Sequence, residues 1–358
     1  MQHRDGACFK AYKRLSEASS LTTERSCFHF DNHDVMKWTL CRHQNRRIYI
    51  YKSHYFAESG FMYFYIYKVG DSMKIDIEMT KQTQRLLDID MHYKDGRNNN
   101  ETGRARREST VKICARFNMI DPTIVSWLYG ISHRMSLEHL NKLVSKDGLL
   151  LGINTIRAPK GRVYVLSFRG AKYAEELLCM PISFRKSAEP SRQINQNNIM
   201  HDLMNVFCCL KGVHEYDENG VQTQLWNGML SEVEFRRLHK SNTKTRVVDG
   251  LLKEVDETVV ACEIEGSFKP KASRQVILLK YLSSLQQGHY QKIFMFSQSK
   301  DILKDAKRFH EQLFVDLTMG YDKKTRKPFF SNDDADLLKR SIIYRTKFCD
   351  ELQSLFYP

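Results

Sequence analysis

The chain has 358 residues, of which 42% are hydrophobic, and this size predicts two or three units with cores of their own. It has no apolar run of membrane-spanning length, and residues 1–20 lack the apolar stretch of a secretory signal. We therefore expect a cytoplasmic protein without membrane insertion. Nine cysteines without a CxxC pair predict reduced thiols rather than disulfides or a zinc site. The net charge of +14 favours nucleic acid as a partner, and a solvated basic surface is the alternative.

Residues 1–92 are predicted to form a β-rich N-terminal region, because aromatic and β-branched residues gather in short runs. These runs lie at 47–51, 61–69 and 73–79. Residues 93–110 have almost no apolar content and combine Gly, Asn and Arg, which predicts a basic flexible linker. Its arginines, Arg104, Arg106 and Arg107, either contact phosphates or belong to an ordinary solvated loop.

Residues 111–180 predict two helices, a β-hairpin and a closing helix. Asp121 and Pro122 are typical of a helix N-cap and first turn, and a second helix is expected over 136–144. Two strands, 149–156 and 163–168, flank a turn at 158–161. A closing helix is expected over 170–178.

This order of elements, with the ending YVLSFRGAKYAEEL, resembles the winged-helix DNA-binding fold. The resemblance implies that the second helix is a recognition helix and that the hairpin is the wing. The residues that would contact DNA are Arg134, His139, Asn141 and Lys142 near the helix, and Arg157, Lys160 and Arg162 on the wing. The alternative is a wing that binds protein.

A polar, proline-containing stretch at 180–198 predicts the main domain boundary. The domain that follows, 199–300, is expected to begin with a helix over 201–210, in which His201 is a capping or packing residue. A second helix is predicted over 226–239, and strands are predicted around 247–252 and over 258–264. We expect Arg237 and Lys240 to contact the DNA backbone.

Acidic residues lie within these two predicted strands and directly after the second. Glu263 and Glu265 alternate with Ile264 and therefore share a strand face, and Asp249 would meet them from the neighbouring strand. Three carboxylates at one sheet edge would suit Mg²⁺ or Mn²⁺. A solvated acidic edge on an ordinary α/β domain is the alternative interpretation.

This spacing resembles the PD-(D/E)xK nuclease pattern, in which an Asp and a Glu on adjacent strands bind the metal. The resemblance implies a restriction-endonuclease-like domain with a mixed sheet, so that the predicted fold class is α/β with a winged helix. Val248 replaces the Pro of the pattern, and Glu265 stands where the pattern has Lys. Lys269, four residues later, is predicted to supply the missing amine.

A longer series of motifs is similar to the plasmid replication-relaxation family and the MobC-type relaxases. The series is HDLMN, SEVEFRR, VVDGLL, VACEIEGSFK and LLKYL. The resemblance places the family's helical His-Glu-x-Asp signature and the Arg that follows it on Ser231, Glu232, Glu234 and Arg237. Ser replaces His and Glu replaces Asp, so that Glu232 is the better supported of the two catalytic carboxylates that the resemblance implies. It implies a metal-dependent enzyme that nicks plasmid DNA at a transfer origin, with other transfer proteins as further partners. Residues 301–358 are predicted to be helices, over 303–317 and 335–356.

Two other functions remain open from the sequence. The first is a sequence-specific DNA-binding protein of plasmid replication or mobilisation, with a catalytically silent nuclease-like domain. The second is a restriction-type endonuclease that cuts both strands. The carboxylates distinguish the first of these from a nicking enzyme, and the form of the DNA product distinguishes the second.

Overall fold

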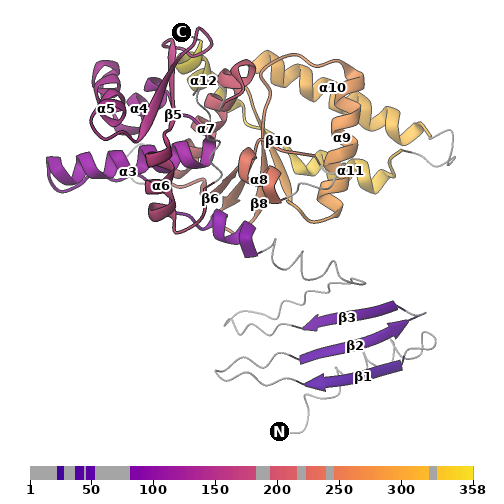
Figure 1. The fold of residues 1–358 in the computed structure, drawn as a ribbon. Coiled ribbons are helices and arrows are strands. Elements are labelled where there is room, and N and C mark those ends of the chain that lie inside the picture. Colours follow the sequence, from indigo (N-terminus) through magenta and orange to yellow (C-terminus); the bar gives the residue numbers. More distant parts are fainter. Residues whose placement is uncertain are drawn as a thin grey trace. The chain divides into compact units, whose positions relative to one another are not determined.

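The computed structural model describes residues 22–27, 37–43, 46–52, 81–182, 194–215, 223–238, 246–321 and 329–357. The chain divides into two units, Met1–Gln82 and Thr83–Pro358. The first unit contains an antiparallel sheet of β1 (Thr22–Cys27), β2 (Lys37–His43) and β3 (Arg46–Lys52), in that order (Figure 1). β3 confirms the strand predicted at 47–51. The strands predicted at 61–69 and 73–79 lie outside the described residues.

The second unit contains a long helix, α3 (Asn99–Phe117), where a flexible linker was predicted. The prediction was wrong because local side-chain contacts, rather than apolar periodicity, stabilise the first half of this helix. Asn98 caps it by accepting hydrogen bonds from two backbone amides, and Arg104 pairs with Glu108 one turn later. The apolar residues that anchor α3 in the core begin only at Val111.

Three helices and a hairpin follow α3 in the predicted order. They are α4 (Pro122–Tyr129), α5 (His133–Ser145), β4 (Leu150–Asn154), β5 (Arg162–Leu166) and α6 (Phe168–Leu178). The Asp121 side chain caps α4 by accepting from the amide of Ile124, as the sequence predicts. The hairpin is antiparallel, and a bridge between Ile120 and Tyr164 ties it to the start of α4.

The rest of the unit surrounds a mixed five-stranded sheet. Its helices are α7 (Ile199–Val213), α8 (Glu232–Leu238), α9 (Lys271–Gln286), α10 (Lys300–Met319), α11 (Asn332–Ser341) and α12 (Cys349–Phe356). Its strands are β6 (Trp226–Ser231), β7 (Gly250–Glu254), β8 (Val259–Ile264), β9 (Lys292–Phe296) and β10 (Ile342–Tyr344). They lie in the order β10-β9-β8-β7-β6, with β6, β7 and β8 antiparallel and β8, β9 and β10 parallel. The protein is therefore of mixed α/β class with a mixed sheet, and none of its described helices is both long and apolar enough to cross a membrane.

Two predicted helices contain strands instead. The first half of the helix predicted over 226–239 is β6, which is buried on both faces and so lacks the alternation that marks a half-exposed strand. The helix predicted over 335–356 is interrupted by β10, where Ile342 and Ile343 pair with β9. Branched side chains pack well at a sheet position and outweigh the helical spacing of the flanking residues.

Helices cover both faces of this sheet. Alternate residues of β7 and β8 belong to different cores: Leu252 and Val260 face α7 and the α3–α6 region, whereas Leu251 and Ala261 face α9, α10 and α11 (Figure 1). The first core runs without interruption from α3 to the sheet, because Val111 and Phe207 belong to the same buried cluster. The helical region and the sheet therefore form one packed body.

A buried ion pair joins α3 to the sheet at this junction. The Arg116 guanidinium donates from Nε and Nη2 to the two carboxylate oxygens of Glu234, at 2.9 Å each, and also to the carbonyl oxygens of Leu86 and Met229. The exposed fractions of the two side chains are 0% and 7%. Glu234 also accepts a hydrogen bond from the amide of Ser231, whose hydroxyl accepts from the amide of Glu234, and the two residues thus cap α8 reciprocally.

We predict that Glu234→Ala lowers the free energy of unfolding by about 3–5 kcal/mol, because it leaves the Arg116 charge buried without its carboxylate. Equilibrium urea denaturation followed by circular dichroism measures this change. Glu138→Ala removes a carboxylate from the exposed Arg134–Glu138 pair and should have a much smaller effect. Equal losses in the two variants would contradict a special role for the buried pair.

Candidate active site at the ends of β7 and β8

Asp249 occupies the residue before β7 and is fixed by the backbone of β8. Its amide donates to the carbonyl of Cys262 at 3.1 Å, and its Oδ2 accepts from the amide of Ile264 at 2.7 Å. The Asn205 side chain of α7 donates to the Asp249 carbonyl at 2.7 Å. These contacts direct the buried carboxylate toward the ends of both strands, as the sequence predicts.

Glu263 lies near Asp249 on β8 and is bound by an arginine that the sequence analysis did not single out. The Arg246 guanidinium donates to both carboxylate oxygens, at 2.9 and 2.8 Å. Burial and the negative charge of Asp249 raise the pKa of Glu263 to about 7, and Arg246 acts in the opposite direction. Burial would lower the pKa of Arg246, but the charge and hydrogen bonds of Glu263, together with the charges of Tyr281 and Asp249, outweigh it and raise the pKa. This pair occupies both oxygens of the carboxylate that was predicted to bind metal.

Glu265 follows β8 and is also buried, with two cations beside it. Lys269 Nζ lies 2.9 Å from Glu265 Oε1, and Arg274 Nη1 of α9 lies 3.9 Å from the same oxygen. The other oxygen, Oε2, is buried and accepts no hydrogen bond from any described residue. The structure thus brings Lys269 to this cluster, as predicted, and adds Arg274.

The first turn of α7 contributes His201 and Asp202, which sequence reasoning did not include in the site. His201 Nε2 lies 3.3 Å from Asp249 Oδ2, and its Nδ1 lies 3.2 Å from Asp202 Oδ1. Burial alone would lower the pKa of His201, but the hydrogen bonds and charges of Asp202 and Asp249 outweigh it and raise the pKa to about 11. The imidazole is therefore cationic at neutral pH, and it lowers the pKa of Asp249 against the opposing effect of burial.

Glu232 begins α8 near the same cluster. Its carboxylate binds Arg236, with Nε of the arginine 2.7 Å from Oε1. Burial raises the pKa of Glu232, and the charges of Asp249 and Asp202 act in the same direction, so these carboxylates share one electrostatic environment. Arg237, predicted to contact the DNA backbone, is half-buried, and Lys240 lies outside the described residues.

The carboxylate oxygens of this cluster are the candidate ligands for Mg²⁺ or Mn²⁺. Within the ranges that the structure describes, no group of three or more His, Cys, Asp or Glu residues is arranged as metal ligands. The carboxylates nevertheless provide the hard oxygen donors that both ions prefer. Glu265 Oε2 is an unpartnered buried oxygen, whereas Glu263 could join it only after releasing Arg246. Binding of either ion by this donor set would therefore require that salt bridge to open.

The residues predicted to bind DNA lie on α5 and on the hairpin, and they differ in how exposed their side chains are. The His139 ring is turned toward α3, where it contacts Thr110 and Tyr129, and burial lowers its pKa to about 4. Asn141 accepts from the Tyr164 hydroxyl and lies against the hairpin. Arg134, Asn141, Lys142, Arg157 and Lys160 are exposed, whereas Arg162 is half-buried and donates to Asn154 and Asn141.

The raised pKa of His201 predicts a pH-dependent stability. A histidine whose folded pKa, about 11, exceeds the unfolded value of 6.5 contributes stability that is complete below pH 6.5 and declines as the pH rises toward 11. His201→Gln should therefore be destabilising at pH 6.5 and progressively less so at higher pH. Urea denaturation of both proteins across this pH range measures the difference, with His133→Gln on α5 as the control. Parallel stability curves would show that the His201 charge is not stabilised by the carboxylates.

Comparison with known proteins identifies no relative of this chain. The chain matches no protein-family model, no curated protein and no solved structure. The basis for a functional proposal is therefore the cluster of carboxylates and cations at the ends of β7 and β8.

Proposed function

We propose that the protein is a metal-dependent endonuclease that nicks DNA, with the carboxylate cluster as its active site. The observation that carries the proposal is the position of Asp249 beside β8, where its Oδ2 accepts from the Ile264 amide between Glu263 and Glu265. The start of β7 and the end of β8 thus place acidic residues at the same edge of the sheet. From α7 to β9 the order is helix, strand, the short helix α8, two strands, helix and parallel strand, which apart from α8 follows the helix, strands, helix, strand order that the nuclease resemblance implies.

The carboxylates Asp249, Glu263 and Glu265 would hold the Mg²⁺ or Mn²⁺. When bound, the ion would lower the pKa of a water molecule and offset the charge that develops on the phosphate. Lys269 contacts Glu265 and is the side chain placed to stabilise a phosphate oxygen or orient the attacking water. His201 holds Asp249 in position and adds a positive charge next to it. Glu232 supplies a further carboxylate from α8.

The segment from α3 to α6 would deliver this site to DNA as a winged helix. Its supporting features are the two helices α4 and α5, the antiparallel hairpin after them, and the exposed basic residues around α5 and the hairpin. A basic surface gains affinity for DNA by releasing condensed counterions. With the motif resemblance, these features favour a relaxase that acts at a plasmid transfer origin in the cytoplasm, together with other transfer proteins.

A catalytically silent DNA-binding protein is the second candidate, and one observation favours it. Arg246 occupies both oxygens of Glu263, and Glu265 stands in place of the usual lysine. A permanent Arg246–Glu263 pair would exclude the ion while it maintained the fold. The two candidates therefore differ in whether this ion pair opens when metal and DNA bind.

We expect the purified protein to convert supercoiled plasmid carrying its origin to open circles with Mn²⁺ or Mg²⁺. Asp249→Asn keeps the shape of the side chain but removes the charge, and should slow nicking by at least about 100-fold while DNA binding persists. Gel electrophoresis of the plasmid over time measures the rate, and a filter-binding assay measures affinity.

Asp336→Asn is the matched control, because it makes the same change on the exposed face of α11 and should nick at the wild-type rate. Nicking at the wild-type rate by Asp249→Asn would contradict the assigned site. DNA binding by the wild type without any cleavage would support the silent candidate, and linear product would indicate a restriction-type enzyme.

A further inference from the structure

We infer that a basic groove between α3, the end of α5 and α6 binds the phosphodiester backbone of nucleic acid, as a second contact surface besides the hairpin. The inference rests on the proposed DNA-binding function and adds a site to it. We call this surface the α3–α6 groove. Its cations are Arg104, Arg107, Lys142, Lys146, Arg169 and Lys172.

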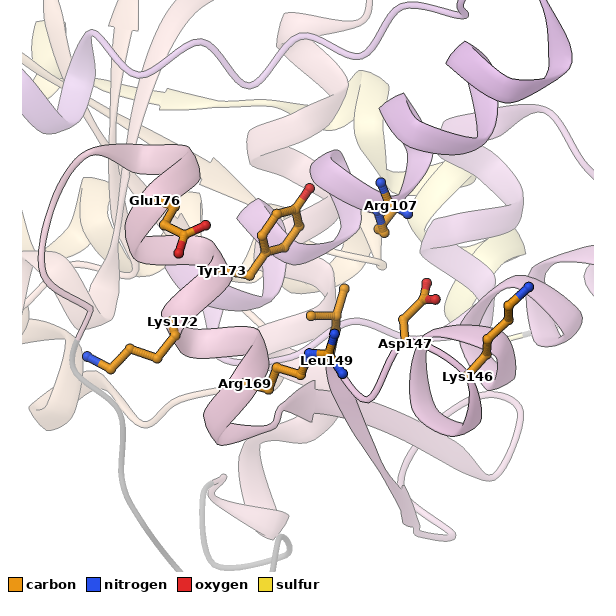
Figure 2. A pocket seen from close by; sticks show the side chains of 8 residues that line it. All are labelled: Arg107, Lys146, Asp147, Leu149, Arg169, Lys172, Tyr173 and Glu176. Atoms are coloured by element: carbon orange, nitrogen blue, oxygen red, sulfur yellow. The ribbon is translucent and has the colours of Figure 1, made fainter.

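The groove consists of two adjoining hollows that share Arg107 and Asp147. The first, of about 410 Å³, is lined by α6 and by the turn after α5, and Figure 2 shows its side chains. The second, of about 260 Å³, lies between the first half of α3 and α5. Because the two hollows share lining residues, they form a continuous track rather than a closed cavity for one small ligand.

The charges of the groove are largely unpaired. Arg104 pairs with Glu108, and Lys172 pairs with Glu175 and extends away from the other cations in Figure 2. The remaining four cations, Arg107, Lys142, Lys146 and Arg169, have no carboxylate within ion-pair distance in the described part of the chain. The lining carboxylates are Asp147 and Glu176, which leaves the track positive. A chain of phosphates matches a linear set of uncompensated cations.

The backbone of the groove also suits close approach by a ligand. Gly103 lines the second hollow within α3, and a Cβ added there would meet no atom within 4 Å. Packing therefore does not require this glycine, although glycine within a helix is less stable than alanine. Its absent side chain leaves the helix surface open at the point where a sugar–phosphate chain would pass. At the other end, Arg169 lies against Gly148, 3.9 Å from the position of a Cβ there.

The position of α5 explains why two such surfaces would be needed. Asn141 faces the hairpin, where Arg162 donates to it, whereas Lys142, the next residue, lines the α3–α6 groove. The exposed face of α5 is thus bordered by basic residues on both sides. If α5 enters a major groove, the hairpin and the α3–α6 groove would each meet one of the flanking phosphate backbones.

The test is the affinity of the full-length protein for a fluorescein-labelled duplex of mixed sequence, measured by anisotropy between about 50 and 200 mM salt. Arg107→Gln/Arg169→Gln should weaken binding on the order of tenfold or more, and reduce the slope of log affinity against log salt by about 1.8 for two lost phosphate contacts. Gly103→Gln adds a good helix former without a charge, so it should keep or raise the melting temperature while it lowers affinity.

Two further variants make the result specific. Lys304→Gln/Arg340→Gln removes two exposed cations from α10 and α11 and should retain wild-type binding. Arg157→Gln/Lys160→Gln, on the hairpin, should weaken binding independently, so that combining it with the groove variant multiplies the losses.

The outcomes separate this inference from the proposed function. If the wild type binds DNA and the hairpin variant weakens it, but both the Arg107/Arg169 and Gly103 variants keep the wild-type affinity and salt slope, the groove is not a binding site. Loss of nicking in Asp249→Asn would still support the endonuclease in that case. Absence of DNA binding by the wild type would overturn both proposals. Binding that the groove variants weaken, without nicking by the wild type, would support the groove and reject the endonuclease.

Discussion

The ion pair between Arg116 and Glu234 is the interaction on which the arrangement of the second unit depends. Two charges removed from water carry a large desolvation penalty, which is offset only when the geometry is good and the remaining donors are satisfied. Arg116 meets this condition with both oxygens of Glu234 and with two backbone carbonyls, although its Nη1 has no described partner. Any shift of α3 relative to β6 would break several of these bonds at once, so the pair fixes one orientation.

This constraint reaches the candidate site through α8. Glu234 also forms the reciprocal cap with Ser231, so the carboxylate that binds Arg116 sets the start of the helix. Glu232 lies between these two residues, and its position near Asp249 and Asp202 follows from that start. The α3–α6 region shares a core with α7, which presents His201 to Asp249. The proposed DNA-binding face and the carboxylates therefore belong to one packed body.

The parts of this structure that local rules determine could be predicted from the sequence. Asp121 and Pro122 mark the start of α4, and the β-branched residues over 258–264 indicate β8, which contains Glu263 and ends one residue before Glu265. Other parts depend on contacts that apolar periodicity does not reveal, either local polar contacts or tertiary packing. The first half of α3 is held by a cap and a surface ion pair, and β6 is buried on both faces. β10 is a strand because β9 lies beside it.

The candidate site shows the same division. The carboxylates were found because strand periodicity places acidic residues together, but the partners of these carboxylates come from distant segments. Arg246 precedes β7 by a few residues in an irregular stretch, and His201, on α7, lies 48 residues before Asp249 in the sequence. The sequence did contain one local signal, a His-Asp pair at the start of the apolar face of α7, which was interpreted as capping or packing. The contact between His201 and Asp249 shows that His201 belongs to the candidate site.

The formal charges of this cluster suggest how metal and DNA would bind. Its five carboxylates, Asp202, Glu232, Asp249, Glu263 and Glu265, are matched by five cations, His201, Arg236, Arg246, Lys269 and Arg274. A divalent ion added to this balanced set would introduce two uncompensated positive charges in a poorly hydrated place. Two phosphates of the DNA backbone would offset both charges, one beside the ion and a second bound by Arg246, whose release would free the Glu263 carboxylate for the ion. We therefore expect metal and DNA to bind with mutual enhancement, which is consistent with an ion pair occupying the proposed metal-binding oxygens when neither ligand is bound.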